Sequence, residues 1–286
     1  MIQQKQNGSS SLLINKYIEK LIDNLPDEIT KNKNKLTIDI VLDGGAFNGS
    51  YLTGALYFLK EMERRKYIKV NRISGCSVGS AAAYFYILDR LDLMEYFHNF
   101  AVYQLQTNYC LEQMINLEEL LKDKITVPSN ICEIMNKKLF ITYNNVKEHK
   151  TVVKSTYKSN KVILETIIKS CYVPFLVSYN NLLYKNKYMD GINPYVFSID
   201  KHKKRKILYL DLFGYDKFKY LINVKNEKSG FHRTLSGLLD IHNFYIKQSS
   251  TEMCSYVNDW SIIDKSRNFI KKMTERAVLY LSLIHI

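Results

Sequence analysis

Ser77 is the side chain in this sequence best placed to act as a nucleophile. It lies in the middle of Gly-Cys-Ser-Val-Gly, residues 75–79, which matches the pattern G-x-S-x-G. In such a turn the serine hydroxyl stands clear of the sheet, and Gly75 and Gly79 avoid the clashes that side chains would cause. The N–H groups that open the following helix favour developing negative charge. The pattern therefore predicts a nucleophile elbow.

Two alternatives to this hypothesis exist at the same turn. Gly and Ser are common in turns, so the five residues alone also fit an ordinary strand-to-helix connection. Their position between a predicted strand and a predicted helix favours the nucleophile. Cys76 is a second possible nucleophile, but it occupies the position before the exposed one. We expect its thiol to pack beneath the elbow.

A second glycine-rich turn, Asp-Gly-Gly-Ala-Phe-Asn-Gly at residues 43–49, follows the first predicted strand. A phosphate-binding loop would need a lysine where Ser50 stands. The adjacent Gly44 and Gly45 break the dinucleotide-binding fingerprint. A loop that binds an oxyanion needs only convergent backbone N–H groups close to the nucleophile, and this hypothesis survives. A plain helix-starting turn remains open for the loop taken alone.

Asp190 is the candidate acid. It lies in Tyr-Met-Asp-Gly-Ile-Asn-Pro, residues 188–194, at the end of a predicted strand, and Gly191 lets the chain turn away from that strand. A Ser-Asp-His triad in α/β-hydrolase order would need a histidine after the acid. Four histidines satisfy this order, but none lies in a recognisable motif, and we expect surface or packing roles for them: His202, His232, His242 and His285.

The elements that must position these residues alternate between strand and helix. Residues 36–42 and 70–74 are short, β-branched runs that predict strands, and residues 50–66 and 81–88 predict the helices that follow. Two successive strand–turn–helix units are typical of a parallel α/β sheet. Further elements are expected downstream: helices within 91–136, a strand pair at 139–143 and 151–155, a helix at 163–170, strands at 182–189 and 206–212, and helices at 235–246 and 262–283.

The glycine loop, the elbow and the late Asp-Gly resemble, in order and spacing, the patatin-like phospholipases. Residues 168–175 resemble the helix-to-proline segment that precedes the family's Asp-Gly, and residues 139–142 resemble its middle strand. The resemblance implies a patatin-like three-layer α/β/α fold with a mostly parallel central sheet and flanking helices. The core would span residues 36–215, preceded by a helical leader and linker at 1–35 and followed by a helical extension at 216–286.

The resemblance also implies a mechanism. Ser77 would attack an ester carbonyl to form an acyl-enzyme, and Asp190 would accept the serine proton directly, without a histidine. Water would then hydrolyse the acyl-enzyme, with no cofactor or metal. Gly191 would support the acid. The oxyanion would be held by backbone N–H groups of Gly44, Gly45, Ala46 and Val78.

The loop departs from the family pattern, which usually reads Gly-Gly-Gly-x-Arg/Lys-Gly. Ala46 replaces the third glycine. This replacement should have little effect on stability unless the position needs a positive φ, where a Cβ costs on the order of 1 kcal/mol. Asn48, before Gly49, replaces the basic residue and so loses a charge that would steady the loop or attract a phosphate head group. Ile192 stands where the family often has Gly or Ala.

The amino-acid composition limits which binding partners are plausible for this chain. The chain has 286 residues, 46% of them hydrophobic, enough for one large α/β domain. The formal net charge of +13 favours an anionic membrane surface, although a compositional bias towards Lys, Asn, Tyr and Ile explains it equally well. Nucleic acid is disfavoured because the tyrosines are spread along the chain. The apolar helices at 91–115 are expected in the core, or alternatively along an acyl-chain groove or as a lid over it.

The cysteines and the first residues of the chain also indicate the kind of protein and its location in the cell. Five scattered cysteines without a C-x-x-C pair argue against a disulfide framework and a zinc site. The polar start lacks a secretory signal, and no apolar run approaches the roughly 18 residues of a membrane span. We expect a cytoplasmic protein that associates peripherally with membranes.

Three functional hypotheses follow. The first is a phospholipase A type lipid acyl hydrolase acting on phospholipid or other acyl lipids, with an activating protein partner possible. The second is an esterase or lipase with a Ser-His-Asp triad. The third is a catalytically weak lipid-binding protein of the same fold, motivated by Asn48.

Overall fold

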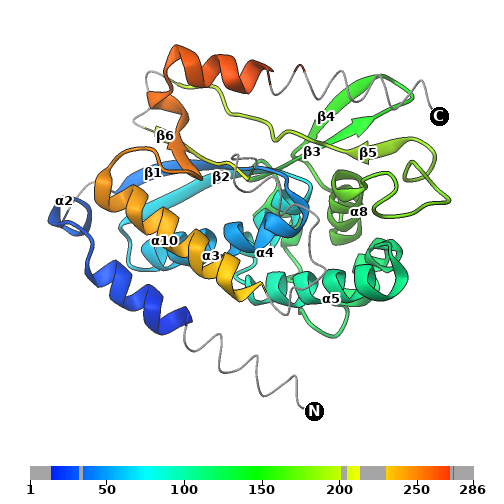
Figure 1. Ribbon diagram of the computed structural model, residues 1–286, viewed down its shortest axis with the longest axis horizontal. Coiled ribbons are helices and arrows are strands. Elements are labelled where there is room, and N and C mark those ends of the chain that lie inside the picture. Colours follow the sequence, from blue (N-terminus) through cyan, green and yellow to red (C-terminus); the bar gives the residue numbers. More distant parts are fainter. Residues whose placement is uncertain (1–13, 32–34, 201–204, 213–229, 271–272, 274–286) are drawn as a thin grey trace.

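A mixed β-sheet forms the centre of the molecule in the computed structural model (Figure 1). The structure describes residues 14–31, 35–200, 205–212, 230–270 and 273. Within them, the strands follow the order β4-β3-β2-β1-β6-β7, and β5 pairs with β3. The strands are β1 (Leu36–Leu42), β2 (Ile68–Cys76), β3 (Leu139–Asn145), β4 (Lys150–Lys154), β5 (Tyr188–Asp190), β6 (Arg205–Leu210) and β7 (Cys254–Tyr256).

The four central strands β3, β2, β1 and β6 run parallel, whereas β4, β5 and β7 are antiparallel to their neighbours. Parallel strands need helices on their faces to cover them. The helices of the structure are residues 14–23, α2 (Asp27–Thr30), α3 (Gly49–Arg64), α4 (Val78–Ile87), α5 (Asp92–Asn108), α6 (Leu117–Leu121), α7 (Ile131–Met135), α8 (Asn160–Cys171), α10 (Phe231–Lys247) and residues 262–270, with 3-10 turns η1 (Ala46–Asn48), η2 (Glu112–Asn116) and η3 (Val257–Asp259).

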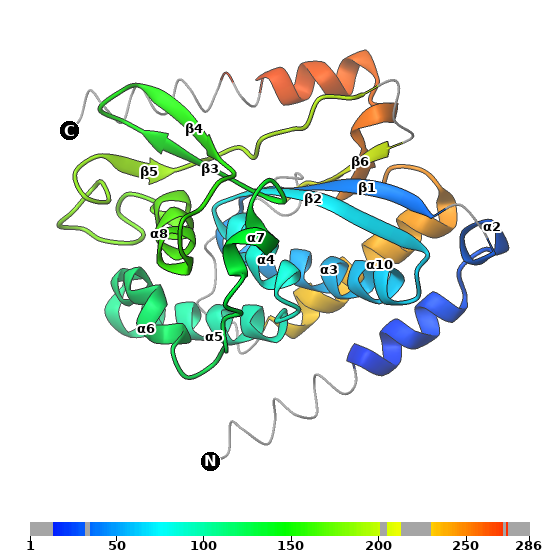
Figure 2. The ribbon, with the colours of Figure 1, turned by 180° about the vertical axis from the view of Figure 1, so that it is seen from behind.

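Both faces of the sheet are covered. Helices α3, α4, α8 and α10 lie below it in Figures 1 and 2, and their apolar faces build the main core with β1 and β2. On the opposite face Val41, Ile207 and Tyr209 pack with Phe197 and Val257 in a smaller core. The helix at 262–270 lies above this face in Figure 1. The expected α/β fold, with a mostly parallel central sheet flanked by helices, is confirmed.

Helices α3 and α10 cross with their backbones in close contact. A Cβ at Gly54 would overlap the carbonyl oxygen of Thr234, and one at Gly237 would overlap that of Tyr51. Only glycine allows this approach. Because α3 begins directly after the glycine loop, the crossing places the start of α10 beside that loop.

Most predicted elements match the structure, with two corrections. The strand expected over 182–189 is only the three-residue β5, because Lys185 and Asn186 adopt φ values of 52° and 54° and turn the chain. Strand β7 was not expected, since three residues carry little periodic signal. Residues 1–13 of the predicted helical leader, and residues 271–272 and 274–283 of the predicted last helix, lie outside the described part of the chain.

Candidate active site

The ends of two strands meet on β3. In the β2–β3 pairing Cys76 lies opposite Thr142, and in the β3–β5 pairing Asp190 lies opposite Tyr143. Strand β4 occupies the other edge of β3 at this level. Strands β2 and β5 therefore share the same edge of β3 and point towards each other, end to end. Ser77, which follows β2, and Asp190, which ends β5, are brought together by consecutive residues of one strand.

Ser77 occupies a strained turn between β2 and α4. Its backbone has φ 51° and ψ −134°, a combination rare for residues other than glycine. A Cβ at Gly75 would overlap the carbonyl of Gly79, and one at Gly79 would approach the carbonyl oxygen of Asp43. Residues 75–79 thus form a tight, strained connection between β2 and α4. Val78 is the first residue of α4, so its N–H has no partner within the helix.

Ser170, on the buried face of α8, holds the elbow in place. The N–H of Ser77 donates to Ser170 Oγ at 2.9 Å, and Ser170 Oγ donates to the carbonyl of Thr142 at 2.6 Å. Ser170 is completely buried. Its role was not predicted from the sequence. The available signal was a serine on the apolar face of a helix, in a segment that resembles the family.

Asp190 carries a buried carboxyl group. Its Oδ1 accepts from the N–H of Ile192 at 2.7 Å, whereas the buried Oδ2 has no well-formed hydrogen bond to any described residue. Burial raises the pKa of Asp190 from 3.8 to about 6, opposed by the nearby Ser77 hydroxyl and by the Ile192 N–H. The two side chains are therefore adjacent without a short hydrogen bond, as is common for catalytic pairs in the absence of substrate.

The turn after Asp190 is tight and strained. A Cβ at Gly191 would overlap the carbonyl oxygen of Thr142. Ile192 has φ 58°, which is unusual for a β-branched residue, and the N–H of Asn193 donates to the carbonyl of Gly191 at 2.6 Å. Cys76 Sγ donates to the carbonyl of Ile192 at 3.4 Å, which agrees with a thiol packed beneath the elbow. The tight turn fixes the direction of the Ile192 N–H, from which Asp190 accepts its hydrogen bond.

The glycine loop lies against the elbow. A Cβ at Gly44 would come to 3.1 Å from Ser77 Cβ, and one at Gly49 would overlap Val78. The Gly44 N–H donates to Asp43 Oδ1 at 3.0 Å, so in this conformation it is engaged by the neighbouring carboxylate. Ala46 has φ 42°, the positive value that makes its Cβ unfavourable. Gly45 and Ala46 remain the candidate oxyanion donors of the loop.

Asn48 is buried and accepts a hydrogen bond at 3.1 Å from the guanidinium of Arg233 on α10. No pattern in the sequence singled out Arg233. It is a lone arginine among apolar and polar residues of a helix that lies outside the region of family resemblance.

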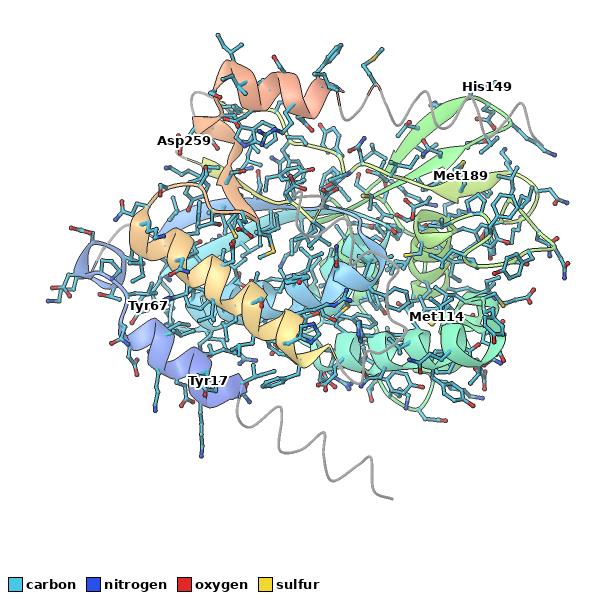
Figure 3. The ribbon with its side chains drawn as sticks, viewed as in Figure 1. Tyr17, Tyr67, Met114, His149, Met189 and Asp259 are labelled. Carbon is cyan, nitrogen blue, oxygen red and sulfur yellow. The ribbon has the colours of Figure 1, made fainter. Side chains whose placement is uncertain are left out.

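An apolar pocket opens beside Ser77. It encloses about 950 Å³, its open mouth included, and is lined by residues of η1, α4, α5, η2 and α8. Met114 of this lining lies beside α5 in Figure 3, below Met189, the neighbour of Asp190. Helix α5 thus packs in the core and lines the pocket. Six of its apolar lining residues are Phe85, Met94, Phe97, Met114, Ile167 and Leu176.

Histidines contribute little to the described site. His98 lines the pocket, where its Nδ1 lies 3.0 Å from Ser50 Oγ. His232 is exposed, and His242 packs against Phe58, with burial lowering its pKa. Within the described residues, no histidine is among the groups that perturb the pKa of Asp190. Two further predicted positions, His202 and His285, lie outside the described residues.

The described residues contain neither a metal-binding cluster nor a membrane-spanning helix. No group of three or more His, Cys, Asp or Glu side chains there is arranged to hold a metal ion. Among the same residues, no helix has both the length and the apolar character needed to cross a bilayer.

The fold and site define an α/β protein with a mostly parallel sheet flanked by helices, in which a serine at a strained turn adjoins a buried aspartate. The family model described as patatin-like phospholipase matches residues 40–192, more than half of the 286 residues. The chain belongs to the patatin-like phospholipase family.

One similar solved structure is the crystal structure of VipD from Legionella pneumophila. Its sequence is 13% identical, and its TM-score is 0.35. The match covers 62% of this chain and 49% of VipD, so the chain spans about half the length of that protein. No curated protein matches the sequence significantly.

Proposed function

We propose that the protein is a lipid acyl hydrolase of phospholipase A type, which cleaves fatty acyl esters of membrane lipids with Ser77 as nucleophile and Asp190 as base. The observation that carries this proposal is the buried Asp190 carboxyl, with a pKa of about 6, beside Ser77 in its strained turn. A base of this pKa is ionised at neutral pH and still accepts a proton readily. Membership of the patatin-like phospholipase family supports the same reaction.

The proposed reaction has two steps. As Ser77 Oγ attacks the ester carbonyl, its proton passes to Asp190. The ester C–O bond then breaks, and the leaving alcohol takes the proton from Asp190. In the second step Asp190 accepts a proton from water, whose oxygen attacks the acyl-enzyme, and the carboxylic acid leaves as the proton returns to Ser77.

The negative charge on the carbonyl oxygen needs fixed donors in both steps. The N–H groups of Gly45 and Ala46 in the loop and of Val78 at the start of α4 are the proposed donors. Backbone N–H groups at a helix start suit an oxyanion because they are already oriented.

The apolar pocket supports a fatty acyl chain as the substrate group. Its lining is dominated by apolar side chains, with Ser50 and His98 as polar exceptions beside the serine nucleophile. Burying an acyl chain there would gain roughly 0.8 kcal/mol per methylene. A small polar ester would gain no such stabilisation.

Aromatic side chains beside the pocket support contact with a membrane surface. Tyr109 and Phe175 are 73% and 62% exposed, and Tyr103 and Tyr179 are also exposed. Tyr179 Oη donates to the carbonyl of Tyr109 at 3.0 Å, which ties the loop after α5 to the loop after α8. Exposed aromatic residues are favoured at membrane interfaces. With the net charge of +13, this surface suits an anionic bilayer.

The test is fatty acid release from phosphatidylcholine vesicles with and without anionic phospholipid. We expect release by the wild type, faster on anionic vesicles, and none by Ser77→Ala or Asp190→Asn. His232→Ala, which changes an exposed histidine on α10, should retain full activity, and this result separates the proposal from a triad esterase. Product analysis identifies the ester bond that is cleaved.

Two results would contradict the proposal. Loss of activity on replacement of any histidine that follows Asp190 would indicate a triad esterase. No release by the wild type, on phospholipid or neutral lipid and with cell extract added to supply an activating partner, would leave lipid binding as the function.

A further inference from the structure

Arg233 occupies an unfavourable position for a charged side chain. It is only 2% exposed and is the third residue of α10. Burial of a guanidinium removes it from water, and the N-terminal end of a helix carries partial positive charge that repels a cation. Both effects destabilise the cation, so Arg233 needs strong local partners to remain charged in this position.

One of these partners is the glycine loop. Arg233 Nη1 donates to Asn48 Oδ1 at 3.1 Å, and Asn48 is completely buried. Asn48 Nδ2 donates to the carbonyl of Leu212, two residues after β6, at 3.4 Å, and its backbone N–H donates to the carbonyl of Gly45 at 2.8 Å. Asn48 therefore links the loop to the end of β6 and, through Arg233, to α10.

The position of Arg233 is rigidly set. The crossing at Gly54 and Gly237 presses α10 against α3, whose first residue follows Asn48. At the start of α10, a Cβ on Gly230 would come within 3.1 Å of His98 in the pocket. The start of α10 is thus packed against the loop and the pocket together.

We propose that Arg233 is a positioning residue for the oxyanion-binding loop, acting through Asn48. Residue 48, where the family pattern usually has a basic side chain, is an asparagine, and α10 supplies the guanidinium to it from outside the matched region 40–192. The bond from Arg233 fixes the Asn48 side chain and with it the turn at Gly45. The positive charge also favours negative charge nearby, since Coulomb interactions are strong where water is excluded. This proposal rests on the proposed function of Ser77.

The test compares Arg233→Met, Arg233→Lys and Asn48→Ala with the wild type. The first measurement is the rate at which a fluorophosphonate probe labels Ser77, together with kcat and KM on vesicles. We expect Arg233→Met and Asn48→Ala to lower the labelling rate and kcat by roughly tenfold or more with little change in KM, and Arg233→Lys to restore part of the loss. Lys247→Met, which removes an exposed cation from the same helix, is the matched control.

The second measurement is hydrogen–deuterium exchange of the peptide that contains residues 43–49, which needs no turnover. We expect faster exchange in Arg233→Met and Asn48→Ala than in the wild type and the control, with α3 unchanged. Folded variants that exchange and react like the wild type would overturn the proposal while leaving Ser77 as the nucleophile. A wild type that neither reacts nor hydrolyses lipid would refute the proposed function, and the exchange data would still decide the role of Arg233.

Discussion

Asp190 ties the proposed chemistry to the stability of the fold. Burial raises its pKa from 3.8 to about 6, so at neutral pH the folded protein holds an ionised carboxyl group in surroundings that penalise its charge. The same burial makes the carboxylate a stronger base towards Ser77. Two measurable consequences follow, one in the rate and one in the free energy of unfolding.

The rate of Ser77 acylation should depend on the ionisation of Asp190. Below its pKa of about 6 the carboxyl is protonated and cannot accept the serine proton. We expect kcat/KM to rise about tenfold per pH unit on the acidic side and to level off above pH 6 to 7. A stopped assay on a soluble ester across pH 4 to 8 measures this profile, and a midpoint near pH 4 would contradict it.

Asp190→Asn should abolish activity and stabilise the protein above pH 6. Between pH 3.8 and about 6 the folded state keeps a proton that the unfolded state has lost, so the wild type loses stability as the pH rises through this range. The pKa change corresponds to at most about 3 kcal/mol. Urea unfolding at pH 8 should therefore favour the variant, and the difference should shrink towards pH 3.

Ala46 stores strain in the glycine loop. Its φ of 42° places a Cβ in the left-handed region, at a cost of about 1 kcal/mol or more. We expect Ala46→Gly to raise the free energy of unfolding by up to about 1 kcal/mol, reduced by the extra freedom of glycine in the unfolded chain. Ala55→Gly, in the buried middle of α3, should instead destabilise by about 1 kcal/mol. Chemical denaturation of both variants is the measurement.

At the scale of elements, Ser170 connects α8 to the elbow after β2 and to β3. Ser170→Ala leaves the buried N–H of Ser77 without this acceptor, which should destabilise the fold by about 1–3 kcal/mol. The elbow would also become mobile, so fluorophosphonate labelling of Ser77 should slow. Ser236→Ala, which changes an exposed serine on α10, is the comparison and should alter neither quantity. If Ser77 in Ser170→Ala were labelled at the wild-type rate, the elbow would keep its conformation without the hydrogen bond to Ser170.

The elements themselves were largely predictable because their signals are local. Strand β1 has the predicted limits, residues 36–42, and the elbow after β2 was recognisable from five adjacent residues. The supporting residues were not predictable in this way. Ser170 reaches Ser77 across 93 positions and Arg233 reaches Asn48 across 185. Such contacts depend on how β3, α8 and α10 pack, which a single sequence does not encode in any short pattern.

At the scale of the whole molecule, we propose that the folding unit extends beyond the region that the family model matches. Strand β1 pairs with β6 on one side, and α10 packs against α3, yet β6 and α10 follow residue 192. The N-terminal helix also buries Ile14, Ile18 and Ile22 in the main core. The sheet and its helices therefore depend on segments from both ends of the described chain.

A fragment of residues 36–200 should consequently fail to fold. It contains the whole matched region, but it leaves β1 as an exposed edge and lacks the apolar face of α10. We expect no cooperative thermal transition by circular dichroism, whereas a fragment of residues 14–270 should unfold cooperatively. Cooperative unfolding of the shorter fragment would show that α10 and β6 are additions to an independent domain.

Two thiols lie near the turn of Ser77: one beneath the turn and one in the lining of the apolar pocket. Cys76 packs beneath the elbow, and Cys171 lines the pocket beside Ser80. Although the residue Cys171 is partly exposed, burial of its thiol raises its pKa to about 12. A protonated thiol is a poor nucleophile, so Cys171 should not take the acyl group from Ser77 as a thioester. Iodoacetamide should likewise leave Cys171 unmodified, which mass spectrometry of the treated protein would test.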